Sequence, residues 1–310
     1  MDALVVVNHR SHALLEQNLA TTAHGLDARV VVVDNLSTDD ERAAVRRVTD
    51  AHGWDLVTAL NDGFGAGVNR GVARARELGC DAFLVLNPDL ELEPATARGL
   101  LDAARRDPLA LVGPRILRPD GSVWFAGGAL DVATGRTRTR PDLVGPTPQW
   151  LTGACLALHD ELWARVGGFS DAYFMYWEDV DLSARVRAAG GRLVVEHALT
   201  AVHDVGGTQE SAGTRRKSDL YYRHNCRGRL VFAARNLDRP AVRAWALRSV
   251  GYARRVVLRG GRRQLLRSPG PVWAAARGTA EGLWFARRDH RDPHDHRDPH
   301  DRRDHQGAPA

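Results

Sequence analysis

Short, uniformly apolar runs alternate with segments of helical periodicity over the first third of the chain. The apolar runs predict buried β-strands at 3–8, 30–33, 55–59 and 82–86. The amphipathic segments between and after them predict helices at 13–24, 41–51, 68–78 and 94–106. Uniformly apolar strands that alternate with helices are typical of a parallel sheet covered on both faces. We therefore predict an α/β protein with a mainly parallel, Rossmann-like sheet.

The rest of the chain divides into segments of different composition. Residues 118–150 are rich in Gly, Pro and Thr and predict a hairpin and a loop, and residues 192–196 predict a further strand. The end of the chain repeats His, Asp and Arg, which predicts a disordered tail without a metal-binding role for its histidines. The first predicted unit is a domain at 1–238, which consists of two halves at 1–117 and 118–238. A helical segment at 239–288 and the tail at 289–310 follow it.

Composition places the chain among globular proteins. It has 310 residues, of which 44% are hydrophobic and 26% charged, enough to bury a sizeable core. No apolar run approaches the ~18 residues that a membrane-spanning helix needs, so we expect a cytoplasmic protein. The three cysteines are far apart and odd in number, and they fit neither a disulfide framework nor a zinc site.

The formal net charge of +5 is unevenly distributed. Residues 239–288 contain twelve arginines and a single acid, Glu281, together with Trp245, Trp273 and Trp284. One interpretation is a solvated helical appendage that packs on the domain. The other, which we favour, is peripheral attachment to an anionic membrane surface. Nucleic acid would also suit the charge, but no nucleic-acid-binding motif accompanies it, so we expect none as a partner.

Polar side chains follow several of the predicted strands. Asp34 comes directly after the strand at 30–33, and Asn87-Pro88-Asp89 follows the strand at 82–86. Ligands of such sheets bind beyond the carboxyl ends of the strands, which makes both positions candidate ligand contacts. A helix cap at 34–39 and an ordinary turn at 87–89 are the alternative interpretations.

A glycine-rich stretch, Gly63 to Gly67, opens the predicted helix at 68–78. Glycines let the backbone approach a diphosphate closely, and the N–H groups of the helix would point at its charge. A dinucleotide-binding Rossmann domain would carry its glycines after the first strand, where this chain has Asn-His-Arg-Ser at 8–11. That argues against an NAD-dependent enzyme.

Three carboxylates, Glu178, Asp179 and Asp181, follow an aromatic cluster in the second half of the chain. Acidic groups are favoured at a helix N-terminus, so a charged cap is one interpretation. The other is a catalytic base, and a second acidic element at Asp89 that is able to hold a metal favours it. His203 follows a short apolar strand and is either a structural histidine or a further metal ligand.

Five ordered motifs carry a resemblance to a known family. They are Val-Val-Asp-Asn-x-Ser-Thr-Asp at 32–39, Asn-x-Gly-Phe-Gly-Ala-Gly-x-Asn-x-Gly at 61–71, Asn-Pro-Asp at 87–89, Thr-Gly-Ala-Cys at 152–155 with Val-Gly-Gly-Phe at 166–169, and Trp-Glu-Asp-Val-Asp at 177–181. Over residues 3–235 the chain resembles family 2 glycosyltransferases, inverting enzymes of the GT-A fold. It is most similar to the rhamnosyltransferase branch, which includes enzymes that add L-rhamnose from dTDP-rhamnose to polyprenyl-diphosphate-linked N-acetylglucosamine.

The resemblance implies roles for individual residues. Asp179 would be the catalytic base, with Glu178 beside it, and Asp89 and His203 would hold Mg²⁺ or Mn²⁺. Asn87 stands where the family usually has an aspartate, so the metal would bind chiefly through Asp89, His203 and the diphosphate. The positions that match nucleotide-sugar binding are Asn8, Asp34, Asn35, Asn61, Gly65, Gly67, Asn69 and Asn87. The positions that match the acceptor side are Thr152, Gly153, Trp177 and Asp181.

The implied partners are a nucleotide-sugar donor and a lipid-linked glycan acceptor, which would place the protein at the inner face of the plasma membrane. Within the family, a hexosyl- or galactofuranosyltransferase with a UDP or GDP donor is the alternative. A sugar nucleotidyltransferase would carry a Gly-rich loop with Arg or Lys after the first strand, which residues 8–11 lack. An inactive sugar-binding module would lack Asp179 or Asp89, and both are present. The oligomeric state stays open.

Overall fold

The computed structural model describes residues 1–35, 38–139, 148–203, 217–266 and 268–289. Within these ranges one nine-stranded sheet has the order β3-β2-β1-β4-β10-β6-β11-β5, with β7 paired to β6. The strands of this sheet are β1 (Asp2–Asn8), β2 (Ala28–Asn35), β3 (Asp55–Ala59), β4 (Ala82–Leu86), β5 (Leu90–Glu91), β6 (Ala110–Leu117), β7 (Val123–Phe125), β10 (Cys155–His159) and β11 (Arg192–His203). All four strands predicted in the first third of the chain are confirmed.

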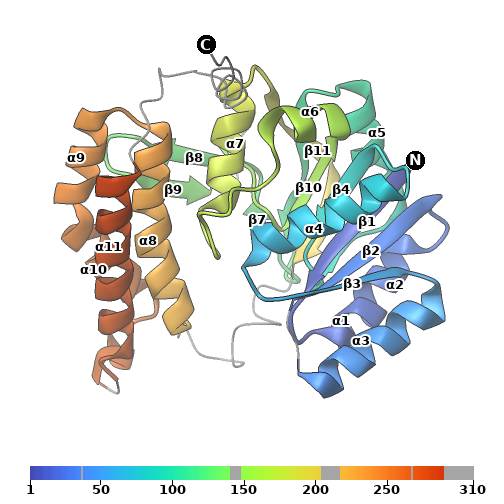
Figure 1. Cartoon of the computed structure of the whole chain (residues 1–310), viewed down its shortest axis with the longest axis horizontal. Coiled ribbons are helices and arrows are strands. Elements are labelled where there is room, and N and C mark those ends of the chain that lie inside the picture. The colour runs from blue at the N-terminus through green and yellow to red at the C-terminus, as the bar shows by residue number, and fades with distance from the viewer. Residues whose placement is uncertain (36–37, 140–147, 204–216, 267, 290–310) are drawn as a thin grey trace, which may run out of the picture.

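Helices lie on the sheet, as Figure 1 shows. They are α1 (His12–Leu14), the π-helix η1 (Leu15–Leu19), α2 (Ala20–Ala23), α3 (Asp39–His52), α4 (Phe64–Glu77), α5 (Pro94–Arg106), α6 (Asp160–Val166) and α7 (Glu178–Ala188). Helix α4 packs on β1 and β2, and α5 packs on β4, β6 and β10. Thr38 caps α3 by accepting a hydrogen bond from the backbone N–H of Glu41 (3.3 Å), which confirms the alternative interpretation of residues 34–39 as including a helix cap.

The structure adds antiparallel strands to the predicted sheet and corrects three predicted elements. Strand β10 runs antiparallel to β4 and β6, and β5 runs antiparallel to β11, so the sheet is mixed. The block β3-β2-β1-β4 and the pair β6 and β11 are parallel, as predicted. A buried strand is apolar in either direction, and its sequence does not reveal which one it takes. The helix predicted at 13–24 is interrupted by the π-turn, which places Leu15 and Leu19 in the core. The glycine stretch forms the first turn of α4, and the strand predicted at 192–196 extends to His203.

The C-terminal helices stand beside the sheet (Figure 1, left). They are α8 (Asp219–Asn236), α9 (Arg239–Leu247), α10 (Ser249–Arg259), the 3-10 turn η2 (Arg262–Leu266) and α11 (Gly270–Arg288). Helix α8, which lies before the predicted boundary at 238, packs along α11, which lies after it. The predicted disordered tail lies outside the described residues apart from Asp289. Of the helices that the structure describes, none is long and apolar enough to cross a membrane.

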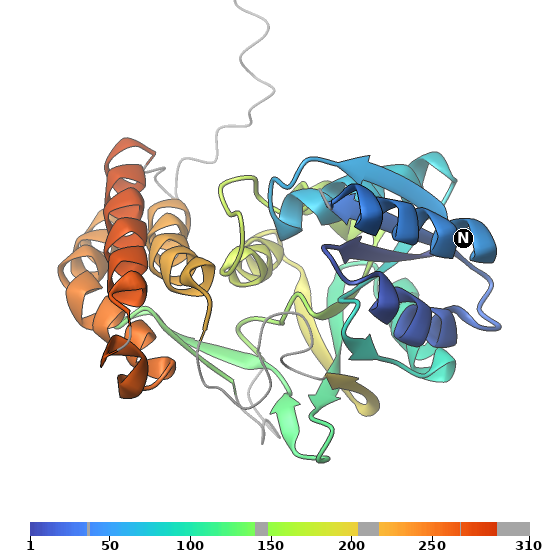
Figure 2. The ribbon, with the colours of Figure 1, turned by 90° about the horizontal axis from the view of Figure 1, so that it is seen from below.

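A two-stranded hairpin, β8 (Gly128–Asp131) with β9 (Arg136–Thr139), reaches from the sheet to the C-terminal helices, as Figure 2 shows. It confirms the hairpin predicted within 118–150. The indole of Trp245 on α9 donates a hydrogen bond to the carbonyl of Val132 in the turn of the hairpin (2.6 Å). Helices and sheet share one continuous hydrophobic core, to which Trp245 itself belongs. Of the three tryptophans in the basic segment, Trp245 is therefore a core residue, and Trp273 and Trp284 are exposed.

Candidate active site

A cavity of about 400 Å³ lies at the carboxyl ends of β1, β2 and β4, where the sequence predicted ligand contacts. We call it the first cavity. Its walls come from these strand ends, from the start of α4, from the segment before α7 and from the start of α8. The lining residues are Val7, His9, Ser11, Asn35, Asn61, Phe64, Asn87, Pro88, Asp89, Phe174, Met175, Ser218 and Leu220.

An amide network supports the wall of the first cavity formed by Asn35 and Asn61. The Asn35 amide nitrogen donates to Asn61 Oδ1 (3.1 Å) and to the Gly63 carbonyl (3.2 Å). The other end of the same side chain, Asn35 Oδ1, is buried and has no hydrogen-bond partner among the described residues. A buried acceptor without a partner is costly, so this oxygen is suited to accept a hydrogen bond from a ligand.

Asn8 and Asp34 lie beneath the first cavity rather than in its wall. Both side chains are fully buried. Asn8 Oδ1 accepts hydrogen bonds from the backbone N–H and the hydroxyl of Ser11 (3.2 and 2.9 Å). Asp34 Oδ2 accepts from Arg42 Nε (3.2 Å). These two residues therefore hold Ser11 and the end of β2 in place.

The glycines and Asn69 of α4 face protein rather than the first cavity. A Cβ atom on Gly65 would lie 2.8 Å from Phe169 Cβ, and one on Gly67 would lie 2.9 Å from Val7 Cγ1. Asn69 donates to the Phe169 carbonyl (2.8 Å) and accepts from the Phe169 N–H (2.9 Å). This part of the glycine-rich motif brings α4 close to β1 and to the Phe169 loop.

Asp89 and His203 are brought together from positions 114 residues apart. Asp89 Oδ1 lies 3.1 Å from His203 Nε2, and both side chains are buried. The pairing of His203 with Leu90 across β11 and β5 creates this proximity, and the Trp124 ring covers the imidazole (4.7 Å between ring centroids). His203 Nδ1 is buried without a hydrogen-bond partner in the described part of the chain. Among the described residues, no group of three or more His, Cys, Asp or Glu residues is placed to hold a metal ion.

Glu178 and Asp179 begin α7 directly after an unusual stretch of backbone. Tyr176 and Trp177 both adopt left-handed conformations, with φ of 64° and 77°. Such strain is rare for large side chains and persists only where the surroundings enforce it. Gly228 on α8 is part of these surroundings, because a Cβ there would lie 2.7 Å from the carbonyl oxygen of Tyr176. The strained turn sets the direction in which α7 presents Asp179.

Asp179 is held at the edge of the first cavity. Its Oδ2 accepts from the backbone N–H of Gly153 (3.2 Å), and its Oδ1 accepts from that of Val180 (2.8 Å). A Cβ on Gly153 would lie 3.1 Å from the ring of Phe64 and 3.7 Å from Asp179 Cβ. Since Phe64 lines the first cavity, Asp179 lies just behind this wall.

The two acids at the start of α7, Glu178 and Asp179, differ in pKa. Burial raises the pKa of Asp179 above the ordinary aspartate value. Burial raises the pKa of Glu178 further, and the adjacent Asp179 carboxylate adds to that shift. One oxygen of Glu178, Oε2, is buried without a partner among the described residues. Asp179 is therefore the first of the pair to ionise, while Glu178 keeps its proton.

The structure places the predicted acceptor-side residues at different depths. Gly153 contacts Asp179, and Thr152 next to it is buried. Trp177 packs in the interior against Phe232 and Trp245. Asp181 is also internal, where it accepts from Tyr173 Oη (3.1 Å), Asn236 Nδ2 (2.9 Å) and Arg185 Nε (2.8 Å). Its contacts show that it joins α7 to α8.

Several lining residues carried no recognisable signal in the sequence. His9 lies in the stretch 8–11 directly after the first strand, and Phe64 lies between the glycines of the stretch at 63–67. Ser218 and Leu220 come from the start of α8, far from every motif. Only the packing of α8 beside α7 brings them to the first cavity.

Comparisons with known proteins identify the class. Residues 4–167 match glycosyl transferase family 2, and this chain belongs to that family. It is 33% identical over 231 residues to the N-acetylglucosaminyl-diphospho-decaprenol L-rhamnosyltransferase of Mycobacterium tuberculosis (strain CDC 1551 / Oshkosh), with 64% of this chain and 75% of the relative covered. It is 25% identical to the low-salt glycan biosynthesis hexosyltransferase Agl10 of Haloferax volcanii, with 65% of this chain and 66% of the relative covered. The chain is a glycosyltransferase, as the motifs predicted.

Solved structures confirm the GT-A fold. The crystal structure of S. aureus TarS 1–349 has a TM-score of 0.50 at 14% identity and covers 92% of this chain and 90% of that chain. The crystal structure of GalNAc-T7 with UDP, GalNAc and Mn²⁺ has a TM-score of 0.55 at 14% identity, with 66% of this chain and 43% of that chain covered. The α/β fold with additional C-terminal helices is therefore as predicted.

Proposed function

We propose that this protein is an inverting glycosyltransferase that moves L-rhamnose from dTDP-rhamnose to a hydroxyl of a lipid-linked N-acetylglucosamine. The observation that carries the proposal is Asp179, a carboxylate held after a strained turn, just behind the Phe64 wall of a cavity on the carboxyl edge of the sheet. The name of the mycobacterial relative supports the sugar and the acceptor. The first cavity would hold the nucleotide-sugar, with Asn35 Oδ1 as an acceptor for one of its N–H or O–H groups.

The reaction would be a single displacement. The acceptor hydroxyl oxygen forms a bond to the anomeric carbon as the bond from that carbon to the nucleoside diphosphate breaks. The hydroxyl proton passes to the ionised Asp179 carboxylate. Because attack occurs opposite the leaving group, the configuration at the anomeric carbon inverts. No covalent intermediate forms, so the chain needs no nucleophile.

A divalent cation, Mg²⁺ or Mn²⁺, fits the pair Asp89 and His203. A buried carboxylate oxygen and an imidazole nitrogen 3.1 Å apart are a suitable start for a site that phosphate oxygens complete. When bound, the cation would neutralise the charge that develops on the departing diphosphate. Asn87 lines the same cavity beside Asp89 and would orient the diphosphate by hydrogen bonding.

The test follows release of the nucleoside diphosphate from dTDP-, UDP- and GDP-sugars with Mg²⁺ and a polyprenyl-diphosphate-N-acetylglucosamine acceptor. We expect acceptor-dependent release from dTDP-rhamnose alone. Release from a UDP- or GDP-hexose would instead favour the hexosyltransferase alternative, which the Haloferax relative's name supports. Absence of acceptor-dependent release from every donor would contradict the proposed reaction.

The activity should depend on pH in a way that reports Asp179. A base must be ionised, and burial raises the pKa of this carboxyl, so kcat/KM should be full at neutral pH and fall as the pH drops through the raised value. The midpoint should therefore lie above the ordinary aspartate pKa of about 3.9. A profile of kcat/KM against pH measures it. A midpoint at or below the ordinary value would contradict the assignment.

The C-terminal helices would attach the protein to the cytoplasmic face of an anionic membrane. Trp273 and Trp284 on α11 are 71% and 58% exposed, and the guanidinium of Arg288 lies over the Trp284 ring (4.5 Å). Exposed tryptophans among arginines suit an interface where rings enter the headgroup layer and cations meet anionic lipids.

Vesicle flotation tests this attachment. We expect the protein to float with vesicles containing phosphatidylglycerol and to lose at least about tenfold in partitioning after Trp273→Ala with Trp284→Ala. Leu60→Ala is the matched control, because Leu60 is also exposed (67%) but lies beyond β3 on the sheet. Equal flotation with purely neutral vesicles would show that the arginines have no part in binding.

A further inference from the structure

A second cavity, of about 500 Å³, lies between α8 and the segments at 61–62 and 171–174. It shares Asn61, Phe174 and Leu220 with the first cavity, so the two are neighbours on one surface. The mechanism above makes no use of its remaining lining residues, which are Asp62, Asp171, Ala172, Arg223, His224 and Arg227.

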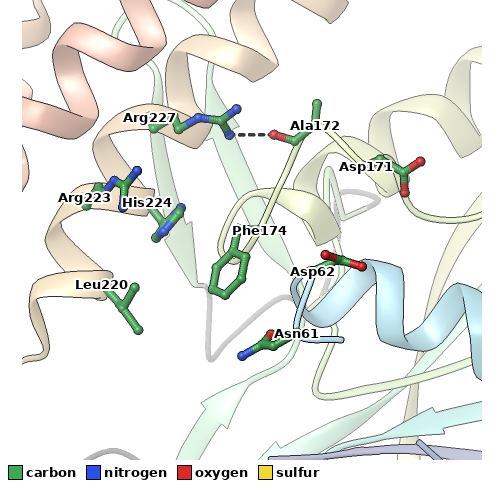
Figure 3. A pocket seen from close by; sticks show the side chains of 9 residues that line it. All are labelled: Asn61, Asp62, Asp171, Ala172, Phe174, Leu220, Arg223, His224 and Arg227. Carbon is green, nitrogen blue, oxygen red and sulfur yellow. Dashed lines mark hydrogen bonds between the residues drawn. The ribbon is translucent and has the colours of Figure 1, made fainter. Parts of the chain in front are cut away.

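The two sides of the second cavity differ in charge. Figure 3 shows Arg223, His224 and Arg227 on the α8 side, with Asp62 and Asp171 across from them. The Asp62 carboxylate is already paired with Arg70, which leaves Asp171, at the exposed rim, as the other acid that lines the cavity.

The arginines on α8 are incompletely neutralised. Arg227 donates to the Ala172 carbonyl (2.6 Å) and forms no ion pair with a carboxylate in the described ranges. Arg223 pairs with Glu281 (2.7 Å), but that carboxylate also pairs with Arg277 (2.9 Å). The α8 side therefore keeps a net positive charge.

His224 lies between these arginines, buried and stacked on Phe174 (5.0 Å between ring centroids). Burial, and after it the charges of Arg223 and Arg227, lower the pKa of His224 to about 4. The imidazole is thus neutral at physiological pH and offers one N–H as a hydrogen-bond donor. Donors and cations together on one wall are the features of an anion site.

We propose that the second cavity is a diphosphate-binding subsite for the lipid-linked acceptor, in which Arg223, His224 and Arg227 contact the diphosphate. This rests on the proposed function, which supplies an acceptor that carries a diphosphate between lipid and sugar. Arg223 and Arg227 lie one helical turn apart on α8, so each guanidinium group can bind one of two linked phosphates. The diphosphate of the donor belongs instead beside Asp89, which lines only the first cavity.

The position of the subsite suits the lipid as well. Leu220, at the boundary between the two cavities, is partly exposed at the start of α8. The start of α11 lies against the start of α8, because a Cβ on Gly270 would be 3.1 Å from the Asp219 carboxylate. Val272 and Trp273 follow Gly270 in the first turn of α11 and are both exposed, so they would offer a prenyl chain apolar side chains at this end of α8.

Calorimetric titration with farnesyl diphosphate, a prenyl diphosphate without sugar, tests the subsite directly. We expect wild-type protein to bind it and Arg227→Gln or Arg223→Gln to bind at least about tenfold more weakly, with partial recovery in Arg227→Lys. Arg277→Gln is the matched control, because Arg277 pairs with the same Glu281 but does not line the cavity. Titration with dTDP should give the same Kd in all variants, which also shows that each remains folded.

The outcomes distinguish the acceptor diphosphate from the donor diphosphate and from the prenyl chain as the group that the second cavity binds. Weaker dTDP binding in Arg227→Gln would assign the cavity to the donor diphosphate and overturn the proposal. Equal affinity for farnesol and farnesyl diphosphate would also overturn it, because the chain rather than the diphosphate would then be recognised. Arginine-dependent binding without sugar transfer would leave the subsite standing and remove the proposed function. Sugar transfer with an unchanged acceptor KM in the glutamine variants would leave the proposed function standing and overturn the subsite.

Discussion

Replacement of Asp179 by asparagine should remove most of the turnover and leave donor binding nearly intact. Asparagine has the same shape and can still accept from the N–H of Gly153, but it cannot take up the acceptor proton. A positioned general base contributes roughly 100- to 10,000-fold to a rate, so kcat should fall within that range. Steady-state kinetics with titration of the nucleoside diphosphate separates the two quantities.

A matched substitution controls for the chemical change itself. Asp102 lies exposed on α5, and Asp102→Asn should leave kcat within about twofold because the residue lines neither cavity. If Asp179→Asn kept near-normal turnover, another group would have to accept the proton. If the Asp179→Asn variant lost donor affinity in proportion to its loss of kcat, Asp179 would have a structural role rather than that of a base.

Replacement of Arg229 by methionine should be the most destabilising single change in the C-terminal helices. Arg229 is fully buried on α8 and donates to three backbone carbonyls, those of Thr134, Gly135 and Trp245 (3.0, 3.1 and 3.0 Å). Its guanidinium lies between the rings of Trp245 and Tyr252 (4.7 and 4.6 Å), and burial lowers its pKa to about 10. Methionine fills similar space but donates none of these hydrogen bonds. The Trp245 carbonyl keeps the Ser249 hydroxyl as a donor (3.0 Å), and we expect the loss of the Arg229 hydrogen bonds to cost about 3 kcal/mol.

Thermal unfolding measures this loss. A cost of that size corresponds to a fall in Tm of roughly 6–12 °C for a chain of this length. Arg254→Met is the control, since Arg254 is an exposed arginine on α10, and its Tm should stay within about 2 °C of the wild type. Arg229→Lys should not restore stability, because an ammonium cannot span three carbonyls as a planar guanidinium does. An unchanged Tm in Arg229→Met would mean that the hairpin and α8 are held together by other contacts.

The order of strands and motifs could be predicted because it depends on local chemistry. Uniformly apolar runs predicted β1 to β4, and the polar residues at the ends of these strands predicted the edge of the sheet at which the first cavity lies. Asp89 and Asn87 were placed correctly at this edge because a strand followed by an Asn-Pro turn defines the position by itself. The choice of Asp179 as base stays a prediction that its position beside Phe64 supports.

Other residues were given roles that depend on what lies around them. Asp34, Gly67 and Asn69 stay predicted nucleotide-sugar contacts, and in the structure they lie against Arg42, Val7 and the backbone of Phe169. The sequence does not show that the Asp34 carboxylate is buried beside the Arg42 guanidinium. Arg42 is only eight residues from Asp34, but Phe169 is 100 residues from Asn69, so local sequence does not reveal that contact.

The sequence by itself determined the family, the α/β alternation and the acidic residues available for catalysis, because apolar periodicity and motif order are properties of neighbouring residues. Only the tertiary structure decided the antiparallel course of β10, the meeting of Asp89 with His203 and the two cavities beside α8. Each of these depends on contacts between segments distant in the chain. Strand direction and helix packing follow from the burial of the whole core, which no local stretch of sequence specifies.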